Sequence, residues 1–283
     1  MNCIFVSDLH GNKKKYYKLF KIIEEKKPDA VFFGGDLLPN QYNNDKTVDD
    51  FIEDELFSKI EKIVKFTDKK IRFFVILGND DPRIFEKKFI SADEEGLIDY
   101  VNEKTVEFNG YFVTGYSYVP PTPFQLKDWE KYDVSRFVDV GSVSPEEGFR
   151  TVKVKKDIIK YSTIKEDLDN LLANAPADKT IFLFHSPPYN SKLDRAALDG
   201  ESVDHAPVDV HIGSIAIQRF IKKKQPFLTL HGHVHESAII TGEWIEKKGD
   251  TYSFSAAHDG AELSIIYFDT NNLSGVIRDL IKI

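Results

Sequence analysis

The sequence contains only one cysteine, Cys3, which excludes an internal disulfide and a cysteine-rich zinc site. Its apolar stretches are all shorter than the roughly 18 residues that a membrane-spanning helix needs. The opening residues MNCIFVSDLHG also lack the basic start, the long apolar segment and the small-residue cleavage site of a secretion signal. From these absences we expect a cytoplasmic protein with no membrane partner.

Positive charge is scarce relative to negative charge, with 38 Lys and Arg residues against 46 Asp and Glu residues and a net charge of −8. A protein of this charge attracts neither nucleic acid nor an anionic membrane over long range, so we expect no extended nucleic acid as a partner. A small phosphate ester is compatible with this charge, because a bound metal ion can reverse the sign locally.

The composition is otherwise that of a globular protein, with 41% hydrophobic and 30% charged residues over 283 positions. A chain of this length buries roughly three quarters of the surface that it exposes when extended, which is enough for a core without stabilising disulfides. We predict a single domain over residues 1–283.

Short apolar segments that end in polar residues recur along the chain. Apolar side chains at helical spacing separate the first two of them and predict a helix over residues 13–26. Because the polar ends are rich in Gly, Asp, Asn and His, they resemble the carboxyl edge at which α/β sheets bind ligands. Five segments are expected to contain strands: 3–8, 30–36, 71–81, 180–190 and 226–237.

Two regions depart from this alternation. Residues 116–160 show no clear period and combine prolines with aromatic side chains, so we interpret them as an insertion near the active-site edge of the sheet. Its residues 116–128 are either a substrate contact or a packed surface loop, and a contact between copies in a homo-oligomer is possible. The tail, residues 239–283, has β-branched and aromatic segments between turn residues, which indicate antiparallel hairpins. We therefore predict two mixed sheets with helices outside.

The polar strand ends carry side chains suited to hard or borderline cations. Two divalent ions about 3.5–4 Å apart can clamp a phosphoryl group and lower the pKa of a bridging water, which requires a carboxylate that contacts both ions and neutral ligands around it. Each short motif is weak evidence alone, but their combination at successive strand ends indicates a dinuclear site. The candidate ligands are Asp8, His10, Asp36, Asn79, His185, His233 and His235.

In their order, these motifs resemble the calcineurin-like metallophosphoesterase superfamily. The matching segments are "DLH", "GGDLL", "GN", the His before "SPP", and "GHVH". The segments "SPPYNSKLD", "HIGSIAIQRFI" and "QPFLTLHGHVHES" are further similar to a bacterial and archaeal subgroup. The resemblance implies a four-layer αββα sandwich of two mixed sheets flanked by helices.

The resemblance also implies how the ligands divide between two metal ions. Asp8, His10 and His235 would hold one ion, while Asn79, His185 and His233 would hold the other, and Asp36 would bridge them. We expect two divalent cations, with manganese favoured and iron, zinc, magnesium or nickel possible, because such donors discriminate weakly among them.

One position departs from the family pattern, which usually continues Gly-Asn with a histidine. This chain has Asp80 there, followed by Asp81. A carboxyl group is a weak proton donor at pH 7 unless its surroundings raise its pKa. Asp80 is therefore a tuned acid, a substrate contact, or a cap for the helix after Pro82. We name Asn79 and Asp80 as the catalytic candidates.

Candidate substrate contacts are harder to identify. Asn12 could donate to a phosphate oxygen, although it could equally cap the helix that follows. Arg195 could bind a substrate anion in a bidentate way, and no spacing distinguishes it from the other arginines. Among the remaining histidines, His231 is expected to be structural. His205 and His211 are both expected to be ordinary polar residues, with His205 as the exception if its loop covers the site.

The function expected from these motifs is hydrolysis of a phosphate ester by a hydroxide that bridges the two metals, with a diester favoured over a monoester. A phosphomonoesterase with the same site is the alternative. The net charge of −8 weighs against a DNA nuclease. A non-catalytic interaction module is disfavoured because all seven ligand positions are filled.

Overall fold

The computed structural model describes residues 1–39, 45–171 and 175–283, and within them two six-stranded sheets form the body of the protein. The first sheet has the strand order β14-β13-β1-β2-β3-β4, and the second has the order β11-β12-β10-β7-β6-β5. Both sheets are mixed, with a run of parallel strands and antiparallel strands at one or both ends.

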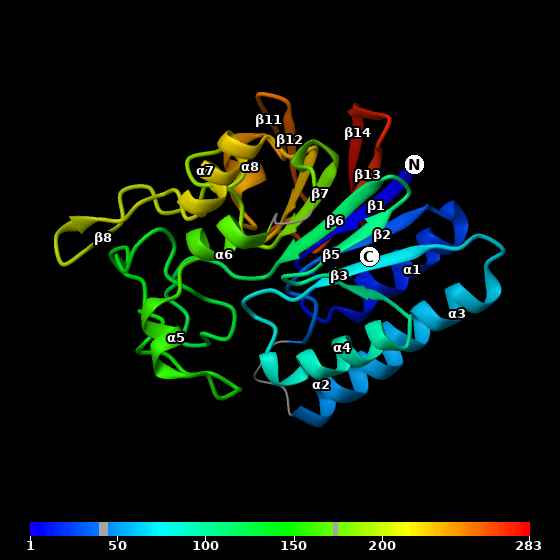
Figure 1. Ribbon diagram of the computed structural model, residues 1–283, viewed down its shortest axis with the longest axis horizontal. Helices are drawn as coiled ribbons and strands as arrows, with labels where there is room; N and C mark the ends of the chain where they lie inside the picture. The colour runs from blue at the N-terminus through cyan, green and yellow to red at the C-terminus, as the bar shows by residue number, and fades with distance from the viewer. Residues whose placement is uncertain (40–44, 172–174) are drawn as a thin grey trace.

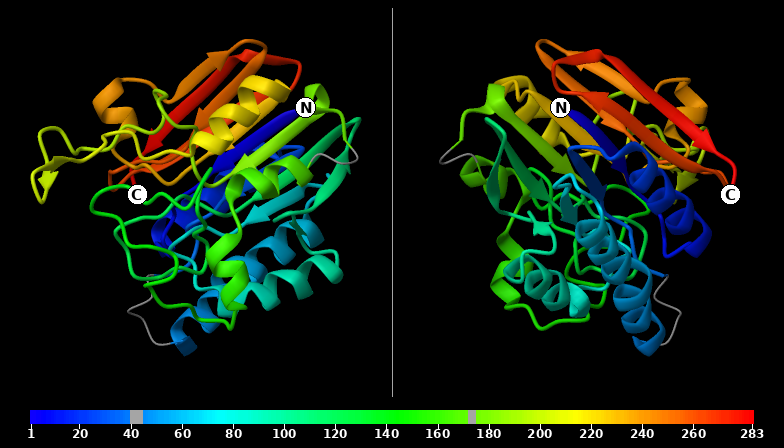
Figure 2. Two further views of the ribbon diagram at one scale, coloured as in Figure 1. Left: turned by 60° about the vertical axis from the view of Figure 1, so that its left-hand side comes forward. Right: turned by 90° about the vertical axis from the view of Figure 1, so that its right-hand side faces the viewer.

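Four parallel strands of the first sheet come from the first 100 residues, and its last two come from the tail. The antiparallel pair β13–β14 lies against β1, so that the two ends of the chain share one sheet (Figure 2). The strands are β1 (Asn2–Val6), β2 (Ala30–Gly34), β3 (Arg72–Ile76), β4 (Asp99–Tyr100), β13 (Leu263–Asp269) and β14 (Asn272–Ile281).

The second sheet is built from the later part of the chain around the parallel strands β6, β7, β10 and β12. Its antiparallel edge strands are β5 and β11, and β11–β12 is a hairpin, as the sequence of the tail predicts. The strands of this sheet are β5 (Thr105–Phe108), β6 (Tyr111–Tyr116), β7 (Thr180–Phe184), β10 (Leu228–His231), β11 (Ile245–Lys248) and β12 (Thr251–Ser255).

Helices cover the outer face of each sheet, which gives four layers (Figure 1). Ser214 caps α7 by accepting a hydrogen bond from Ile217 N at 3.0 Å. The helices are α1 (Lys13–Lys26), α2 (Asp45–Phe51), the π-helix η1 (Ile52–Phe57), α3 (Ser58–Phe66), η2 (Arg83–Phe85), α4 (Glu86–Glu94), α5 (Lys156–Tyr161), α6 (Ile164–Leu171), η3 (Ala177–Lys179), α7 (Ile215–Lys224) and α8 (Ser237–Thr241).

The alternation of side chains along the strands explains the layers. In β1, Cys3 and Phe5 belong to the core between the two sheets, while Ile4 and Val6 belong to the core beneath the helices. A strand that is buried on both faces is apolar throughout, which is why these segments are nearly continuous hydrophobic runs. The predicted fold, two mixed sheets flanked by helices, is confirmed.

Two segments lie outside this regular framework. Residues 117–155, between β6 and α5, contain isolated bridges but no helix or named strand. Residues 190–213 contain only the short antiparallel strands β8 (Ser202–Val203) and β9 (Ala206–Pro207), whose hairpin projects from the body (Figure 1). None of the helices in the described part of the chain is both long and apolar enough to cross a membrane.

Candidate metal centre

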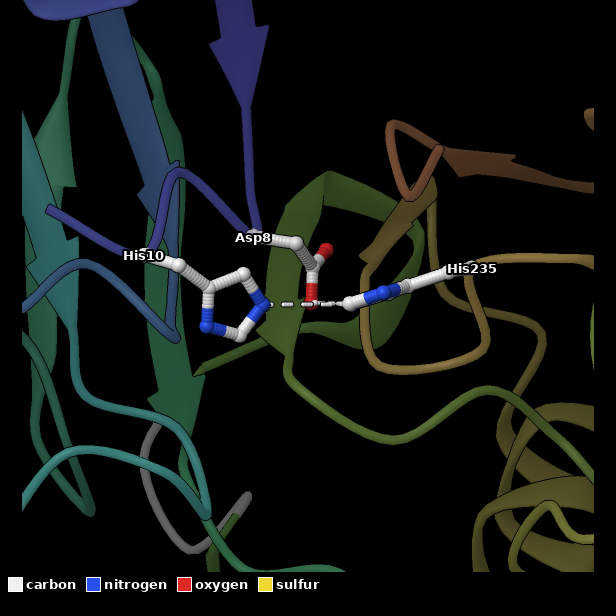
Figure 3. Close-up of side chains that lie close together, drawn as sticks. All are labelled: Asp8, His10 and His235. Atoms are coloured by element: carbon white, nitrogen blue, oxygen red, sulfur yellow. Dashed lines mark hydrogen bonds and ion pairs between the residues drawn. The ribbon is translucent and has the colours of Figure 1, made fainter. Parts of the chain in front are cut away.

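A first cluster of metal-ligating side chains lies where β1 and β10 end. Asp8 and His10 follow β1, His235 follows β10, and their ligand atoms lie within 4.8 Å of one another. The two imidazole rings approach the Asp8 carboxylate from opposite sides (Figure 3). His235 Nε2 is 3.3 Å from Asp8 Oδ1 and 3.3 Å from His10 Nε2. One carboxylate and two imidazoles that face one point are a suitable ligand set for a divalent cation.

A second cluster lies at the ends of β2, β7 and β10 and consists of Asp36, His185 and His233, whose ligand atoms are again within 4.8 Å of one another. His185 Nε2 is 3.2 Å from Asp36 Oδ2 and 3.0 Å from Asn79 Oδ1. The other ring nitrogen of His185 donates a hydrogen bond to the carbonyl of Gly34 at 2.8 Å. This bond fixes the tautomer and leaves Nε2 available as the ligand atom.

Asp36 connects the two clusters. Its carboxylate belongs to the second cluster, and it also lies within 4.8 Å of the ligand atoms of His10 and Asp80. Asp36 Oδ1 accepts a hydrogen bond from Asp80 N at 2.8 Å, which fixes the orientation of the carboxylate. A carboxylate that is to contact two ions needs this position between the two ligand sets.

The backbone at four of the candidate ligands adopts a left-handed conformation, which side chains other than glycine seldom adopt. The angle φ is 56° at Asp8, 43° at His10, 53° at Asp36 and 73° at His233. Such conformations cost about 1–3 kcal/mol each and are found where the surrounding structure enforces them, often at functional sites. The chain therefore gives up local stability to aim these four side chains at one place.

The loops after β2 and β3 are held together by Asp81, a fully buried residue. Its carboxylate accepts hydrogen bonds from Leu37 N at 3.0 Å, Leu38 N at 2.8 Å and Gly78 N at 2.9 Å. Gly78 itself permits the close approach of the two loops, because a Cβ at this position would overlap the Asp36 carboxylate. Sequence reasoning assigned Asp81 no such role.

Each cluster contains a carboxylate paired with an imidazole, Asp8 with His235 and Asp36 with His185. Burial raises the pKa of Asp8, but the hydrogen bond from His235 and the nearby histidine charges outweigh it, and the pKa lies below its ordinary value. Burial lowers the pKa of His235, but the bond to Asp8 raises it to about 9. In the second cluster burial again opposes pairing, yet the two charges lower the pKa of Asp36 and raise that of His185 to about 10. A cation would compete with these imidazole protons, because metal ligation requires neutral imidazole.

The donor set fits two divalent cations. Asp8 Oδ2 is buried and has no hydrogen-bond partner in the described part of the chain, which is costly unless a cation satisfies it. Burial, together with the charge of His185, lowers the pKa of His233 to about 3, so this ring is neutral and can bind a metal at ordinary pH. Oxygen and nitrogen donors without thiolate suit manganese, iron, magnesium and zinc.

A cavity of about 790 Å³ borders the candidate centre, and its lining includes Asp36, Asn79, Asp80, His233 and His235. The rest of the lining comes mainly from residues 120–142 and 196–213, which we call the loop wall. The two halves of the loop wall meet, since a Cβ on Gly141 would lie 3.6 Å from Val203.

Buried polar contacts hold the first half of the loop wall. Lys127 Nζ lies 2.6 Å from Glu130 Oε2, and both side chains are 0% exposed. Lys127 also donates to the carbonyl of Thr122 at 2.8 Å, and the amide of Thr122 donates to Glu130 Oε2 at 2.9 Å. Trp129 Nε1 donates to the carbonyl of Asp81 at 2.8 Å, which ties the loop wall to the loops of the metal side.

Asp80 lies at the cavity, and one of its three expected roles is excluded. Arg83 N, at the start of η2, donates to Asp128 Oδ2 at 2.8 Å, so Asp128 rather than Asp80 caps this turn. The negative charge of Asp36, followed by burial, raises the pKa of Asp80 to about 7. A tuned acid and a substrate contact remain as predictions for Asp80.

Asn12 and Arg195 have other partners in the structure and do not line the cavity. Asn12 Oδ1 accepts hydrogen bonds from the amides of Lys14 and Lys15, so the side chain caps α1. Arg195 donates to the carbonyl of Ala196 and pairs with Asp199. We therefore leave both residues out of the proposed site.

The other arginines that could bind a substrate anion also contact protein groups. These pairs are Arg83 with Glu86, Arg136 with Glu146, and Arg150 with the carbonyl of Pro145.

The remaining histidines differ from expectation at one point. His231 is buried between the carbonyl of Ser186 and the hydroxyl of Thr229, which is the expected structural role. His205 is exposed in the turn of the β8–β9 hairpin, whereas His211 lines the cavity. Sequence reasoning named His205 rather than His211 as the exception, although "HIGS", from one of the subgroup motifs, begins at His211.

The model of the family described as calcineurin-like phosphoesterase matches residues 1–237 of this chain. One solved structure is 17% identical, covers 99% of both chains and has a TM-score of 0.60. The protein TT1561 of Thermus thermophilus is 16% identical, again with 99% of both chains covered, and has a TM-score of 0.56. A dimetal phosphatase from Danio rerio is 10% identical over 95% of this chain and 92% of that chain, with a TM-score of 0.55. No curated protein matches the chain.

Proposed function

Because the chain belongs to the calcineurin-like phosphoesterase family, we propose that it is a dinuclear-metal-dependent hydrolase that acts on small phosphodiesters. The observation that carries this proposal is the pair of ligand clusters at the edge of one cavity, with Asp36 of the second cluster also close to His10 of the first. Asp8, His10 and His235 would hold one ion, and His185, His233 and Asn79 the other.

When bound, two such ions lower the pKa of a water between them and neutralise charge on the phosphoryl oxygens. The chain's own contribution is to fix the ligands before substrate arrives. Asn79 is held from both ends of its amide, since Oδ1 lies 3.0 Å from His185 Nε2 and Nδ2 donates to Asp80 Oδ1 at 3.1 Å. Groups fixed in this way need no reorganisation as charge develops in the transition state.

The cavity lining supports a diester over a monoester. Asp80, which is not one of the proposed metal ligands, places a carboxyl group at the cavity, and in its ionised form it repels a dianionic monoester more strongly than a monoanionic diester. Among the described residues, no Lys or Arg lines the cavity. The loop wall adds apolar side chains such as Pro120, Phe124 and Leu198, which can contact the organic group of an ester.

The test is reconstitution of chelator-stripped protein with manganese, iron, zinc, magnesium or nickel in separate samples. Each sample is assayed on bis(p-nitrophenyl) phosphate and on p-nitrophenyl phosphate. We expect metal-restored turnover that favours the diester, with manganese among the active ions. A preference for the monoester would instead support a phosphatase. Protein that binds no metal would contradict the proposal and support a non-catalytic role.

A further inference from the structure

Two segments that the candidate metal centre does not use meet at the cavity. They contain Asp194, from "SPPYNSKLD", and His211, from "HIGS". Asp194 is 0% exposed and accepts hydrogen bonds from the amides of Asn190 at 2.8 Å and Ser191 at 2.9 Å. Its Oδ1 also lies 2.8 Å from His211 Nδ1. A buried carboxylate with this many donors is a rigid support for the imidazole.

The orientation of His211 follows from these contacts. A carboxylate only accepts, so Nδ1 of His211 carries the hydrogen that Asp194 binds. The backbone next to His211 is fixed as well, because Ile212 N donates to the carbonyl of Asp194 at 3.1 Å. The ring of Tyr189 packs edge-on against the imidazole ring of His211, with the two ring centroids 5.9 Å apart. His211 Nε2 has no partner in the described residues, and the side chain, 25% exposed, lines the same cavity as Asn79.

We propose that His211 is the proton donor to the leaving group and that Asp194 is its positioning residue. This inference rests on the proposed phosphodiesterase function. As the oxygen of the attacking water bonds to phosphorus, that water gives up one proton to solvent, and the bond from phosphorus to the leaving oxygen breaks with its electron pair on that oxygen. The Nε2 proton of the doubly protonated His211 ring moves to the leaving oxygen, which leaves a neutral ring with Nδ1–H still bound to Asp194. Solvent returns the proton.

The position of His211 distinguishes it from Asp80. In an in-line displacement the leaving oxygen departs on the side opposite the attacking water. Asp80 lies within 4.8 Å of the ligand atoms of His10 and Asp36, so its carboxyl group lies directly beside the candidate metal ligands. His211 comes from the loop wall, a part of the cavity that contributes none of the candidate metal ligands.

The test varies the leaving group. The variants His211→Asn and Asp80→Asn are compared with wild type on methyl 4-nitrophenyl phosphate and methyl phenyl phosphate. Phenolate is more basic than nitrophenolate, so its departure depends far more strongly on a proton donor. We expect H211N to lower kcat/KM by about 100-fold or more on the phenyl ester and by less than about 10-fold on the nitrophenyl ester. Asp194→Asn should show the same selectivity with a smaller loss.

Controls separate this inference from the proposed function. His205→Asn changes an exposed histidine of the same segment that does not line the cavity, and both rates should stay at the wild-type value. Metal content and melting temperature are measured on each variant, and His211→Gln replaces H211N if that variant does not fold. Equal losses on both esters, or the selective loss in Asp80→Asn instead, would overturn the inference. A wild-type protein inactive with every metal would overturn both proposals.

Discussion

The two sides of the cavity are built in different ways. On the metal side, candidate ligands follow strands of two regular sheets, and the strand pairing fixes where each loop begins. The loop wall has almost no regular structure and is held by single buried groups, among them Lys127 and Asp194. A strand end is fixed by many backbone hydrogen bonds, whereas each half of the loop wall depends on a few side chains. Substitutions of the metal-side ligands should therefore act on metal binding and chemistry, whereas substitutions of the buried groups that hold the loop wall should act on its stability and shape.

The largest effect is expected for Asp36→Asn on the metal side. The amide can still accept the hydrogen bond from Asp80 N, so the fold should survive, but it binds two cations poorly. Loss of a hydrogen-bond partner of a metal ligand lowers metal affinity or activity by about 10- to 100-fold. Loss of the connecting ligand itself should therefore lower kcat/KM by more than about 100-fold. Activity on the diester, bound metal per chain and melting temperature test this. Asp169→Asn, which changes an exposed carboxyl group of α6 that does not line the cavity, is the control. A variant that keeps a tenth of the wild-type rate would contradict the role of Asp36.

The second effect concerns the loop wall. Lys127→Met leaves Glu130 buried without its cation, and breaking a buried pair in this way costs about 3–5 kcal/mol. Urea unfolding measures the loss of stability. A raised KM with unchanged metal content would show that the substitution disturbs the loop wall and leaves the metal side intact. Burial raises the pKa of Glu130 to about 7 from an ordinary value of 4.5, despite Lys127. In the variant this pKa rises further, so the deficit relative to wild type should shrink as the pH falls from above 7 to about 7, where Glu130 of the variant is already protonated. Below that pH Glu130 is protonated in both proteins, and the deficit should stay constant.

A double variant provides the matched comparison for Lys127→Met. In Lys127→Met with Glu130→Gln, the amide can still accept from Thr122 and no charge is left without a partner. This variant should recover most of the lost stability, because replacing both members of a buried ion pair is often close to neutral. If it is as unstable as the single variant, the pair does not act through its charges.

The same contrast explains what the sequence could predict. His185 follows β7 directly, and parallel strands bring their carboxyl ends to one edge, so a list of polar strand ends already assembles both ligand clusters. Asp36 could be placed between them only through the resemblance, because spacing along the chain does not indicate which carboxylate lies at the centre.

The loop wall was not predictable by such reasoning, since it has no period from which pairing could be inferred. Asp128 caps a turn at Arg83, 45 residues away, and Asp194 supports His211, 17 residues away. Neither partnership follows from propensity or spacing. Arg195 fails as a candidate for the same reason: its chemistry suits a phosphate, but the fold gives it Asp199 as a partner.

The smallest effect is expected for Asn12→Ala, which tests whether the loop after His10 serves the helix or the substrate. As the cap of α1, Asn12 accepts from two backbone amides, and its loss should cost about 1 kcal/mol of stability with kcat and KM unchanged. Asn12→Asp keeps the acceptor and should restore the stability. Ser214→Ala removes the equivalent cap from α7 and should cost a similar amount. A KM that rises in Asn12→Ala and not in Ser214→Ala would mean that Asn12 contacts the substrate and is more than the cap of α1.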